Sequence, residues 1–350
     1  MTPPEIKHPL ILESKLEEIL EYLRSQGKID QAEDIYLPLV EQIITWKQEI
    51  DRPLVQGIVG GQGTGKTTLC RLLQKILEIA GYATASLSLD DLYKTYAERQ
   101  ELLIQEPRFR WRGPPGTHEV QLGLDILEQV RTSTTLSANT SKTPLFTSTS
   151  LSERSPNSQP TIALPRFDKS LWAGMGDRTT PDLVKIPDIL LFEGWFVGVL
   201  PRILPKNSSP FTNYINQQLH AYLPLWEKLD KLILLYPEDY RFCLQWRLQA
   251  EQEMIASNKS INTNQDKNVG DSLHQNGMTS AEITNFVEYF WEALPPEIFI
   301  SPLTNPPSPV DLVIPLNVDH RLGQPYSIDP ENLHFPRKNV LFDRSETVHP

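Results

Sequence analysis

The stretch GIVGGQGTGKTTLCRLL, residues 57–73, decides the fold that we expect for this chain. Its pattern G-x-x-x-x-G-K-[ST] has its fixed positions at Gly60, Gly65, Lys66 and Thr67. An apolar run at 54–59 predicts a buried strand before the loop, and apolar residues at helical spacing predict a helix over 66–80. A strand, a glycine-rich loop and a helix in this order are typical of a P-loop, whose main-chain N–H groups and helix N-terminus face phosphate. The alternative is a glycine-rich turn with an exposed lysine, and the two flanks make it the weaker interpretation.

The P-loop predicts where a nucleoside triphosphate and its metal ion bind. Lys66 would reach the β- and γ-phosphates, and the Thr67 hydroxyl would bind Mg²⁺. The residues expected to contact ATP are Gly60, Gly61, Gln62, Gly63, Thr64, Gly65, Lys66, Thr67 and Thr68.

The composition is that of a soluble protein with long polar segments: 39% of the 350 residues are hydrophobic, and the net charge is −11. This charge argues against nucleic acid or an anionic membrane as the main partner, so an anionic substrate needs a local basic cluster. The sequence lacks an apolar run of membrane-spanning length and the basic-then-apolar order of a signal peptide. Cys70 and Cys243 fall in helical patterns and are expected to be buried and reduced. We therefore expect a cytoplasmic protein, and its oligomeric state stays open.

Three regions are expected along the chain: a helical extension over 1–50, a P-loop domain over 51–320 and a C-terminal tail over 321–350. Within the central domain, 132–163 is rich in Ser and Thr and has no apolar period. Such a segment cannot bury enough surface to offset its ordering entropy, so we expect a disordered insertion. The polar stretch 257–277 is expected to be a mobile loop.

Short apolar runs alternate with helical patterns through the central domain. The further strands are expected at 83–89, 189–192, 231–236 and 310–316, and the further helices at 118–131, 239–255 and 280–294. Thr117 is the expected N-cap of the first of these helices, and Thr279 with Glu282 forms a capping box for the last. The alternation predicts an α/β fold: a parallel β-sheet with helices on both faces and extra N-terminal helices.

Two carboxylates follow predicted strands and suit phosphoryl transfer, which needs metal support and a group near the acceptor hydroxyl. Glu193 directly follows the apolar run ILLF and is the candidate that supports the metal; its alternatives are a solvated strand end or an N-cap. Asp90 follows another strand and is expected to accept or align the acceptor proton, with the metal as a further contact. Asp91 is an equal candidate for a mere helix cap, and spacing does not separate the two.

Two loops supply the basic residues that an anionic substrate requires. The segment PRFRWRGPPGTHE, 107–119, carries Arg108, Arg110 and Arg112 and is otherwise a solvated surface loop. The segment PRFDKSLWAGMGDR, 165–178, carries Arg166, Lys169 and Arg178; its alternative is an ion-pair network with Asp168 and Asp177. The substrate contacts are expected among Asp90, Tyr93, Arg112, His118, Arg166, Lys169 and Arg178.

Two further residues have competing interpretations. Arg247 lies on a predicted helix before a polar stretch, where a lid arginine reaches the γ-phosphate, but a surface arginine explains the pattern equally well. His118 is either a substrate contact or a plain capping residue at a helix start. Lys66, Asp90, Glu193 and Arg247 are thus the catalytic candidates.

Taken together, the motifs GGQGTGKTTL, SLDDLYKTY, RGPPGTHE, PRFDKSLWAGMGDR, FEGW and WRLQAE resemble D-glycerate 3-kinase of the plant and cyanobacterial type. That family is kin to uridine kinase and phosphoribulokinase, and the resemblance spans about residues 52–316. It implies transfer of the ATP γ-phosphate to the 3-hydroxyl of D-glycerate, as in photorespiratory salvage. Leu92 departs from the pattern, since phenylalanine is more usual there, and the segments 132–163 and 257–277 are longer than typical.

The resemblance also implies residue roles. Lys66 and Thr67 take the P-loop roles, Asp90 matches the carboxylate that acts as base, and Glu193 matches the carboxylate near Mg²⁺. Two rivals stay open: the same chemistry on another acceptor, such as a nucleoside or a pantothenate-like alcohol, and a P-loop switch protein that regulates a partner.

Overall fold

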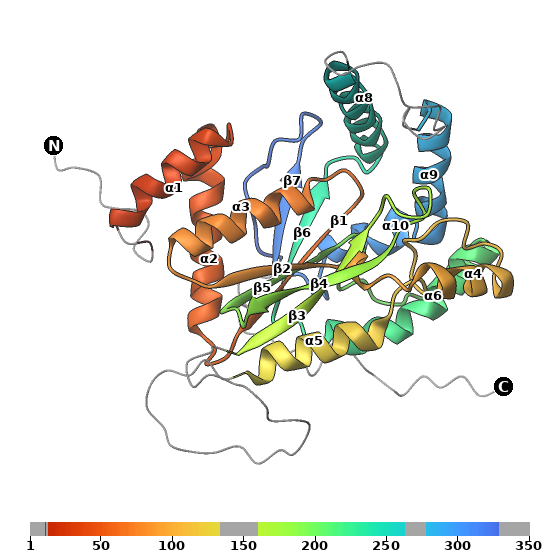
Figure 1. Ribbon diagram of the computed structural model, residues 1–350, viewed down its shortest axis with the longest axis horizontal. Helices are drawn as coiled ribbons and strands as arrows, with labels where there is room; N and C mark the ends of the chain where they lie inside the picture. Colours follow the sequence, from red (N-terminus) through yellow and green to blue (C-terminus); the bar gives the residue numbers. More distant parts are fainter. Residues whose placement is uncertain (1–10, 12, 134–159, 263–277, 329–350) are drawn as a thin grey trace.

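The computed structural model describes residues 11, 13–133, 160–262 and 278–328, and its centre is a sheet of five parallel strands (Figure 1). In spatial order they are β2 (Thr84–Ser88), β5 (Ile189–Gly194), β1 (Leu54–Gly60), β6 (Lys231–Pro237) and β7 (Leu312–Leu316). Every residue of β1 and β5 is buried because helices cover both faces, which is why both segments are largely apolar. The predicted parallel α/β architecture is confirmed.

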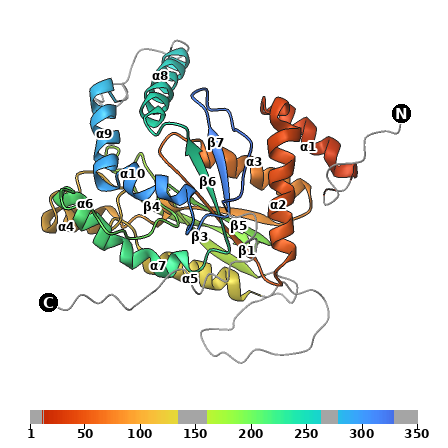
Figure 2. The same cartoon turned by 180° about the vertical axis from the view of Figure 1, so that it is seen from behind.

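One face of the sheet is covered by the helix that follows the P-loop and by the N-terminal helices (Figure 2). These helices are α1 (Glu13–Ser25), α2 (Leu37–Gln48), which continues from a π-helical turn at Ala32–Tyr36, and α3 (Lys66–Ile79). Ile43 of α2 and Leu73 of α3 share one buried apolar cluster with Ile58 of β1. Within 1–50, the described helices therefore pack on the sheet as part of the same core.

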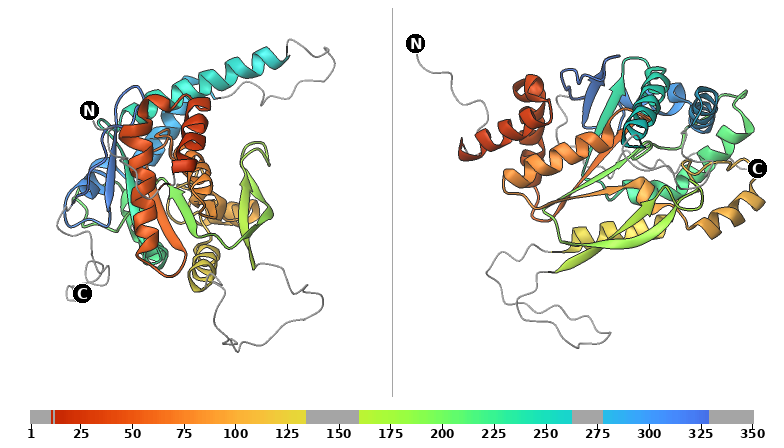
Figure 3. Two further views of the ribbon diagram at one scale, coloured as in Figure 1. Left: turned by 90° about the vertical axis from the view of Figure 1, so that its left-hand side faces the viewer. Right: turned by 45° about the horizontal axis from the view of Figure 1, so that its top comes forward.

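The opposite face is covered by helices from the second half of the chain, together with the helix that precedes the Ser/Thr-rich segment. They are α5 (Val120–Thr132), α6 (Pro210–Gln218), α7 (Leu223–Trp226), α9 (Ser280–Ala293) and α10 (Pro296–Phe299). The long helix α8 (Phe242–Asn262) packs beside α9 and extends away from the body of the domain (Figures 2 and 3). The first residues of α8 lie next to the P-loop, because the Cβ position of Gly61 is 2.9 Å from Cys243 Sγ.

A second, two-stranded antiparallel sheet consists of β3 (Thr161–Asp168) and β4 (Asp177–Lys185). It was not predicted, because its outer strand is almost wholly exposed and has no apolar alternation. The tip between the strands requires glycine: Gly176 has φ 70°, and a Cβ there would lie 2.3 Å from the Phe167 ring. This hairpin carries the 165–178 motif toward the short helix α4 (Tyr96–Gln105) and the 3₁₀ turn Leu89–Leu92.

The half-buried carboxylate of Asp230 joins three parts of the domain at the start of β1. Arg52 donates two hydrogen bonds to it, at 2.6 and 2.9 Å. Arg131 of α5 donates another at 2.6 Å, and the Val55 N–H donates a fourth at 2.9 Å. Burial raises the pKa of Asp230, but these donors outweigh it and lower the pKa below its ordinary value.

Several local predictions need correction or refinement. Thr117 does not cap α5, which follows Glu119; the Thr117 hydroxyl instead donates to the Pro114 carbonyl at 2.8 Å. The helix expected to end at residue 255 continues to Asn262. The capping box of α9 is confirmed, with Glu282 N–H donating to the Thr279 hydroxyl.

The segment between α5 and β3 is shorter than the predicted 132–163, because α5 reaches Thr132 and β3 starts at Thr161. The expected disorder over the rest of 132–163, the expected mobile loop beyond 262 and the tail beyond 328 lie outside the described residues. Among the helices that the structure describes, none combines the length and the apolar character needed to cross a membrane.

Candidate active site

The P-loop forms the turn between β1 and α3, at the carboxyl edge of the sheet. Gly63 and Gly65 have φ values of 74° and 82°, in the left-handed region that glycine adopts without steric cost. The Lys66 ammonium donates to the Gly61 carbonyl at 2.8 Å, so its side chain lies across the loop. Of the two fixed glycines of the motif, Gly65 is explained by its backbone conformation, and Gly60 by a Cβ that would lie 2.9 Å from Thr64 Oγ1.

Glu193 meets the P-loop helix at the end of β5. The Thr67 hydroxyl donates to Glu193 Oε1 at 2.8 Å, and the Glu193 side chain is buried. Parallel pairing of β5 with β1 sets this contact, since Glu193 lies in register with Ile58. The structure therefore brings together Thr67 and Glu193, two of the three residues predicted from the sequence to bind the metal ion; the third, Asp90, has other partners.

Asp90 and Asp91 are adjacent in sequence but have different surroundings. Asp90 accepts a hydrogen bond from the Tyr93 hydroxyl at 2.7 Å, and Lys169 Nζ of the hairpin lies 2.6 Å from its other oxygen. Burial raises the pKa of Asp90, but Lys169 and Tyr93 outweigh it and lower the pKa below its ordinary value. Its side chain is 31% exposed, so Asp90 is an ionised carboxylate that an acceptor can reach.

Asp91 instead links the 3₁₀ turn Leu89–Leu92 to strand β3 through hydrogen bonds to main-chain N–H groups. It accepts hydrogen bonds from the main-chain N–H groups of Ser88 and Phe167, at 3.1 and 3.2 Å. Arg166 donates to Asp91 at 3.0 Å and to Asp182 at 2.7 Å. Burial dominates these bonds and raises the pKa of Asp91. The helix-cap interpretation therefore describes Asp91, and Arg166 is engaged by two carboxylates rather than directed to a ligand.

Tyr93 is the centre around which the acceptor side of the site is arranged. Its ring stacks on His118 with centroids 4.6 Å apart, and the Arg112 guanidinium lies 5.9 Å from its centroid. His118 Nδ1 is hydrogen-bonded to the Tyr222 hydroxyl at 2.8 Å, and burial lowers the pKa of His118 to about 3. His118 Nε2 is buried and has no hydrogen-bond partner among the described residues. His118 is thus a neutral ring beside the tyrosine that holds Asp90, and it does not cap α5.

Three guanidiniums surround the hairpin tip and are held by main-chain carbonyls. Arg112 donates to the carbonyls of Gly174 and Met175 at 2.8 and 3.0 Å. The buried Arg99 donates to those of Met175 and Gly176 at 2.7 and 2.6 Å.

The third guanidinium belongs to Arg178, which donates to the Tyr93 carbonyl at 2.8 Å and has a buried Nη2 with no partner in the described structure. None of the three forms a salt bridge with a described residue, so carbonyl dipoles hold their positive charge without neutralising it.

The predicted alternative for Arg166, Lys169 and Arg178 was an ion-pair network with Asp168 and Asp177. Arg166 and Lys169 do form ion pairs, but with Asp91, Asp182 and Asp90. Asp168 instead binds Ser170, and Asp177 accepts main-chain N–H groups and the Trp172 indole.

The other two arginines of the 107–119 segment face elsewhere. Arg108 forms a salt bridge with Glu106 at 2.6 Å, and Arg110 is exposed over the Trp111 ring. Of the three arginines in that loop, Arg112 is the one at the acceptor side.

Arg247 lies on α8 close to the P-loop, since its main-chain nitrogen is 3.7 Å from the Cβ position of Gly63. Its guanidinium is held by the buried Glu251 one turn later, at 2.8 Å. The backbone of Arg247 therefore lies beside the P-loop while its guanidinium is paired with Glu251, and the lid interpretation stays a prediction.

Sequence reasoning missed three residues of this site: Arg99, Glu251 and His320. Arg99 and Glu251 lie in helices, where a single charged residue by itself predicts a surface position. His320 follows β7 in a segment without periodicity, yet its Nε2 is 2.6 Å from the Gly63 carbonyl and its ring stacks on Trp246 at 4.0 Å. No local signal identifies any of them, because their roles depend on contacts distant in sequence.

Comparison with known proteins finds similarity to kinases, although no family model matches the chain. The chain is 30% identical over 220 residues to the probable ATP-dependent kinase TDA10 of Saccharomyces cerevisiae, covering 58% of this chain and 69% of that protein. It is 28% identical over 251 residues to the chloroplastic D-glycerate 3-kinase of Arabidopsis thaliana, covering 69% of this chain. The match spans 47%, less than half, of the Arabidopsis protein.

A solved structure, D-glycerate 3-kinase from Cryptococcus neoformans, superimposes with a TM-score of 0.62 at 24% identity. The match covers 83% of this chain and 99% of that one, and it shows that the two share a fold.

Proposed function

The chain belongs to the family of P-loop kinases that includes D-glycerate 3-kinase, and we propose that it phosphorylates D-glycerate on its 3-hydroxyl. The products are 3-phospho-D-glycerate and ADP, as in photorespiratory glycerate salvage. The observation that carries the proposal is the guanidinium cluster of Arg99, Arg112 and Arg178 beside the Asp90–Tyr93 pair. A small acceptor with a carboxylate supplies the negative charge that this cluster lacks, and guanidinium forks match carboxylate geometry.

Asp90 is proposed to align the acceptor hydroxyl and take its proton. The hydroxyl oxygen forms a bond to the γ-phosphorus while the bond to the β-bridging oxygen breaks, and ADP leaves with that electron pair. A carboxylate with a lowered pKa is a weak base, so it takes the proton late, as the metaphosphate-like transition state of kinases allows. Tyr93 and Lys169 hold the two Asp90 oxygens in place.

Lys66 and Arg247 are proposed to neutralise charge on the transferred phosphoryl group. Both lie at the P-loop: Lys66 spans it, and Arg247 sits at the α8 end that packs on Gly63. Fixed cations stabilise the charge that spreads over the phosphoryl oxygens in the transition state. The remaining P-loop residues, from Gly60 to Thr68, are proposed to contact the ATP phosphates.

A magnesium ion is proposed to bind at Thr67 and Glu193. Their hydroxyl and carboxylate oxygens meet at 2.8 Å, and oxygen is the ligand that Mg²⁺ prefers. Among the described residues there is no cluster of three His, Cys, Asp or Glu side chains, which suits an ion that takes its other ligands from phosphate and water. When bound, the ion neutralises phosphate charge. Asp90, also a predicted metal ligand, is held by Tyr93 and Lys169 instead.

The nucleoside rival differs from D-glycerate in charge, whereas a pantothenate-like alcohol also carries a carboxylate and differs from D-glycerate in size. A nucleoside has no anionic group for the guanidinium cluster, and a regulatory P-loop protein has no need of a carboxylate and arginines directed at a small acceptor. Arg112, His118, Lys169 and Arg178 are therefore proposed as the acceptor-facing residues.

The deciding experiment measures ADP release with Mg-ATP in the presence of D-glycerate, L-glycerate or uridine. We expect turnover that depends on D-glycerate, with 3-phosphoglycerate as the product. Turnover with uridine alone would move the assignment to another acceptor, and hydrolysis indifferent to all three would favour a nucleotide switch.

A further inference from the structure

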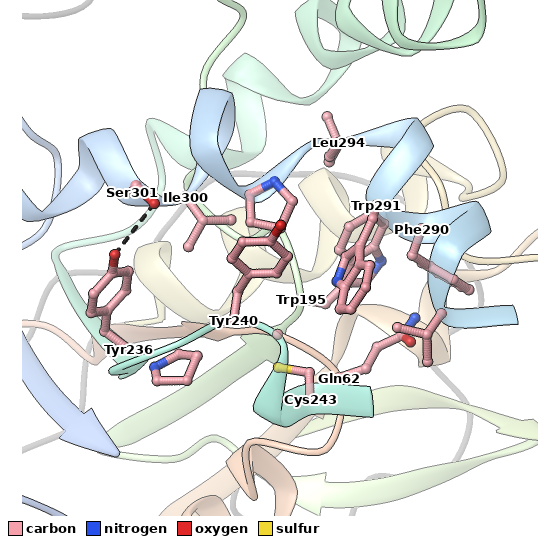
Figure 4. A pocket seen from close by; sticks show the side chains of 14 residues that line it. Gln62, Trp195, Tyr236, Tyr240, Cys243, Phe290, Trp291, Leu294, Ile300 and Ser301 are labelled. Atoms are coloured by element: carbon pink, nitrogen blue, oxygen red, sulfur yellow. Dashed lines mark hydrogen bonds between the residues drawn. The ribbon is translucent and has the colours of Figure 1, made fainter. Parts of the chain in front are cut away.

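The P-loop has conformational freedom that its own sequence does not remove. Gly63 and Gly65 both adopt left-handed φ values, and glycine takes either sign of φ at little cost. On one side of the loop, Gly61 and Gln62 line a pocket of about 560 Å³, including its open mouth, instead of packing on a filled core (Figure 4). A contact from elsewhere in the chain can therefore decide which conformation the loop keeps.

His320 makes such a contact from the segment that follows β7. Its Nε2 lies 2.6 Å from the Gly63 carbonyl oxygen. A carbonyl oxygen can only accept, so Nε2 carries a hydrogen and the imidazole donates. The bond joins positions 257 residues apart and connects the carboxyl end of the edge strand β7 to the nucleotide loop.

The turn over 317–321 fixes where the His320 ring points. Asn317 Oδ1 accepts the main-chain N–H groups of Asp319 and Arg321 at 3.0 and 2.9 Å, and the Asn317 carbonyl accepts the His320 N–H at 3.1 Å. His320 itself has φ 60°, an unfavourable conformation for a residue with a Cβ. Strained residues of this kind persist where the surroundings hold them, and they gather at ligand sites.

Two further contacts support the ring and the turn. Trp246 of α8 stacks on His320 with centroids 4.0 Å apart, and its indole N–H donates to the Val318 carbonyl at 2.8 Å. Gln31 Nε2 donates to the Leu322 carbonyl at 2.6 Å and anchors the turn to the N-terminal region. Although its side chain is exposed, His320 thus meets the P-loop from a firm support.

The bond to Gly63 bears on phosphate binding through the geometry of the peptide. A peptide unit is planar, so a donor that holds the Gly63 carbonyl also fixes the direction of the Thr64 N–H. Main-chain N–H groups of this kind form the phosphate cradle of a P-loop. A loop already held in the binding conformation loses less freedom when phosphate arrives, and the apparent affinity rises with the fraction of molecules in that conformation.

We propose that His320 is a positioning residue of the nucleotide site: it donates to Gly63, holds the P-loop in the conformation that receives phosphate, and so raises the affinity for the nucleotide. This role rests on the part of the proposed function that places a nucleotide at the P-loop. It does not depend on which acceptor is phosphorylated.

Three variants of the full chain separate the donor from the ring. His320→Phe keeps a ring over Trp246 and removes the N–H, and His320→Leu removes the N–H as well if the phenylalanine variant does not fold. His320→Gln removes the ring but keeps an N–H donor of similar reach. His220→Phe is the matched control, at an exposed histidine in the turn Leu219–Tyr222 on the opposite face of the sheet.

The test measures the MgADP dissociation constant of each variant by calorimetry. It should rise about threefold to fivefold in His320→Phe, up to the equivalent of one net hydrogen bond, and stay within about twofold of the wild type in His320→Gln and His220→Phe. Without nucleotide, amide hydrogen exchange over residues 57–68 should be faster in His320→Phe by a similar factor, because the loop leaves its native conformation more often. A general loss of stability, followed by urea unfolding, would not be restored by glutamine.

The results divide cleanly. An unchanged MgADP affinity in folded His320→Phe, or an affinity in His320→Gln as weak as in His320→Phe, would overturn the role of the His320 donor. A wild-type chain that does not bind MgADP would overturn the nucleotide site and this role with it. MgADP binding with the expected order of variants but no turnover with D-glycerate would support the role of His320 and remove only the proposed acceptor.

Discussion

The neighbours Asp90 and Asp91 offer a matched pair of substitutions that separates chemistry from architecture. Asp90→Asn removes the charge that is proposed to align the acceptor hydroxyl and take its proton, but it keeps an oxygen for the Tyr93 hydroxyl. Asp91→Asn removes the carboxylate that accepts two backbone N–H groups and Arg166. We expect the first variant to lose turnover while it stays folded, and the second to lose stability.

The magnitudes follow from the contacts. A positioned base contributes roughly 10²–10⁴ to turnover, and the lowered pKa of Asp90 places it toward the weaker end, so kcat should fall about 10²–10³-fold. Its lost ion pair is with Lys169, which is 61% exposed, so unfolding free energy should change by less than about 1 kcal/mol. In Asp91→Asn the amide NH₂ replaces one of the two oxygens, so it faces a backbone N–H that loses its hydrogen-bond acceptor. That should cost about 1–2 kcal/mol, after partial relief from burying the charge that raises the pKa of Asp91.

Both variants are compared with the wild type by ADP release at saturating Mg-ATP and D-glycerate, by KM for ATP, and by urea unfolding. The KM for ATP should stay the same in Asp90→Asn, because Asp90 contacts the acceptor side. The reasoning fails if Asp90→Asn keeps half of the wild-type kcat. It also fails if Asp91→Asn lowers kcat as far as Asp90→Asn does while its unfolding free energy is unchanged.

Lys169→Met removes the ammonium that lowers the pKa of Asp90, so burial should raise that pKa and move the acid limb of kcat/KM to higher pH; an unmoved limb would exclude Asp90 as its source. Arg112→Met should raise the KM for D-glycerate about 10–100-fold without changing the KM for ATP, whereas Arg108→Met, whose arginine pairs with a glutamate, should change neither. Asp230→Asn should lower the unfolding free energy by about 2 kcal/mol in urea at neutral pH. Because the pKa of Asp230 is lowered in the folded state, its contribution to the unfolding free energy is present above the ordinary carboxyl pKa and is lost as the pH falls through the folded pKa. The Asp230→Asn variant should therefore lose less stability in acid than the wild type. Identical pH profiles of the unfolding free energy would contradict this role of Asp230.

The sequence predicted the sheet because its strands carry local signals. Buried parallel strands such as β5 are continuous apolar runs, and Thr279 with Glu282 marks the start of a helix within four residues. The β3–β4 hairpin has no such signal: β4 is held by pairing and by contacts of its first residues, not by burial of its own side chains. A strand of that kind is visible only once its partner is known.

The site residues that could be predicted from the sequence are those that directly follow a predicted strand. Glu193 and Asp90 fall at the carboxyl edge of the sheet by topology alone, and the P-loop locates Thr67. Spacing alone did not separate Asp90 from Asp91, and Asp90 was chosen from the strand end and the resemblance. The contacts that hold Asp91 are partly local, in its capping box with Ser88, and partly with Arg166 and Phe167, more than seventy residues later. Arg99 was not predicted as a site residue for the same reason, since it donates to the carbonyls of Met175 and Gly176 at the hairpin tip, which lie far away in the sequence.

Charge explains why the arginines of this site are bound to carbonyls rather than to carboxylates. The chain carries a net charge of −11 and as a whole repels anions, so the proposed anionic acceptor must meet a local field of opposite sign. A carboxylate partner would fix Arg112 or Arg178 equally well but would cancel the charge that the acceptor needs. Main-chain carbonyls at Tyr93 and Met175 orient the guanidiniums and leave that charge in place. An uncharged acceptor would leave the cluster uncompensated, so discrimination against nucleosides is expected to arise from the same contacts that bind the hydroxy acid.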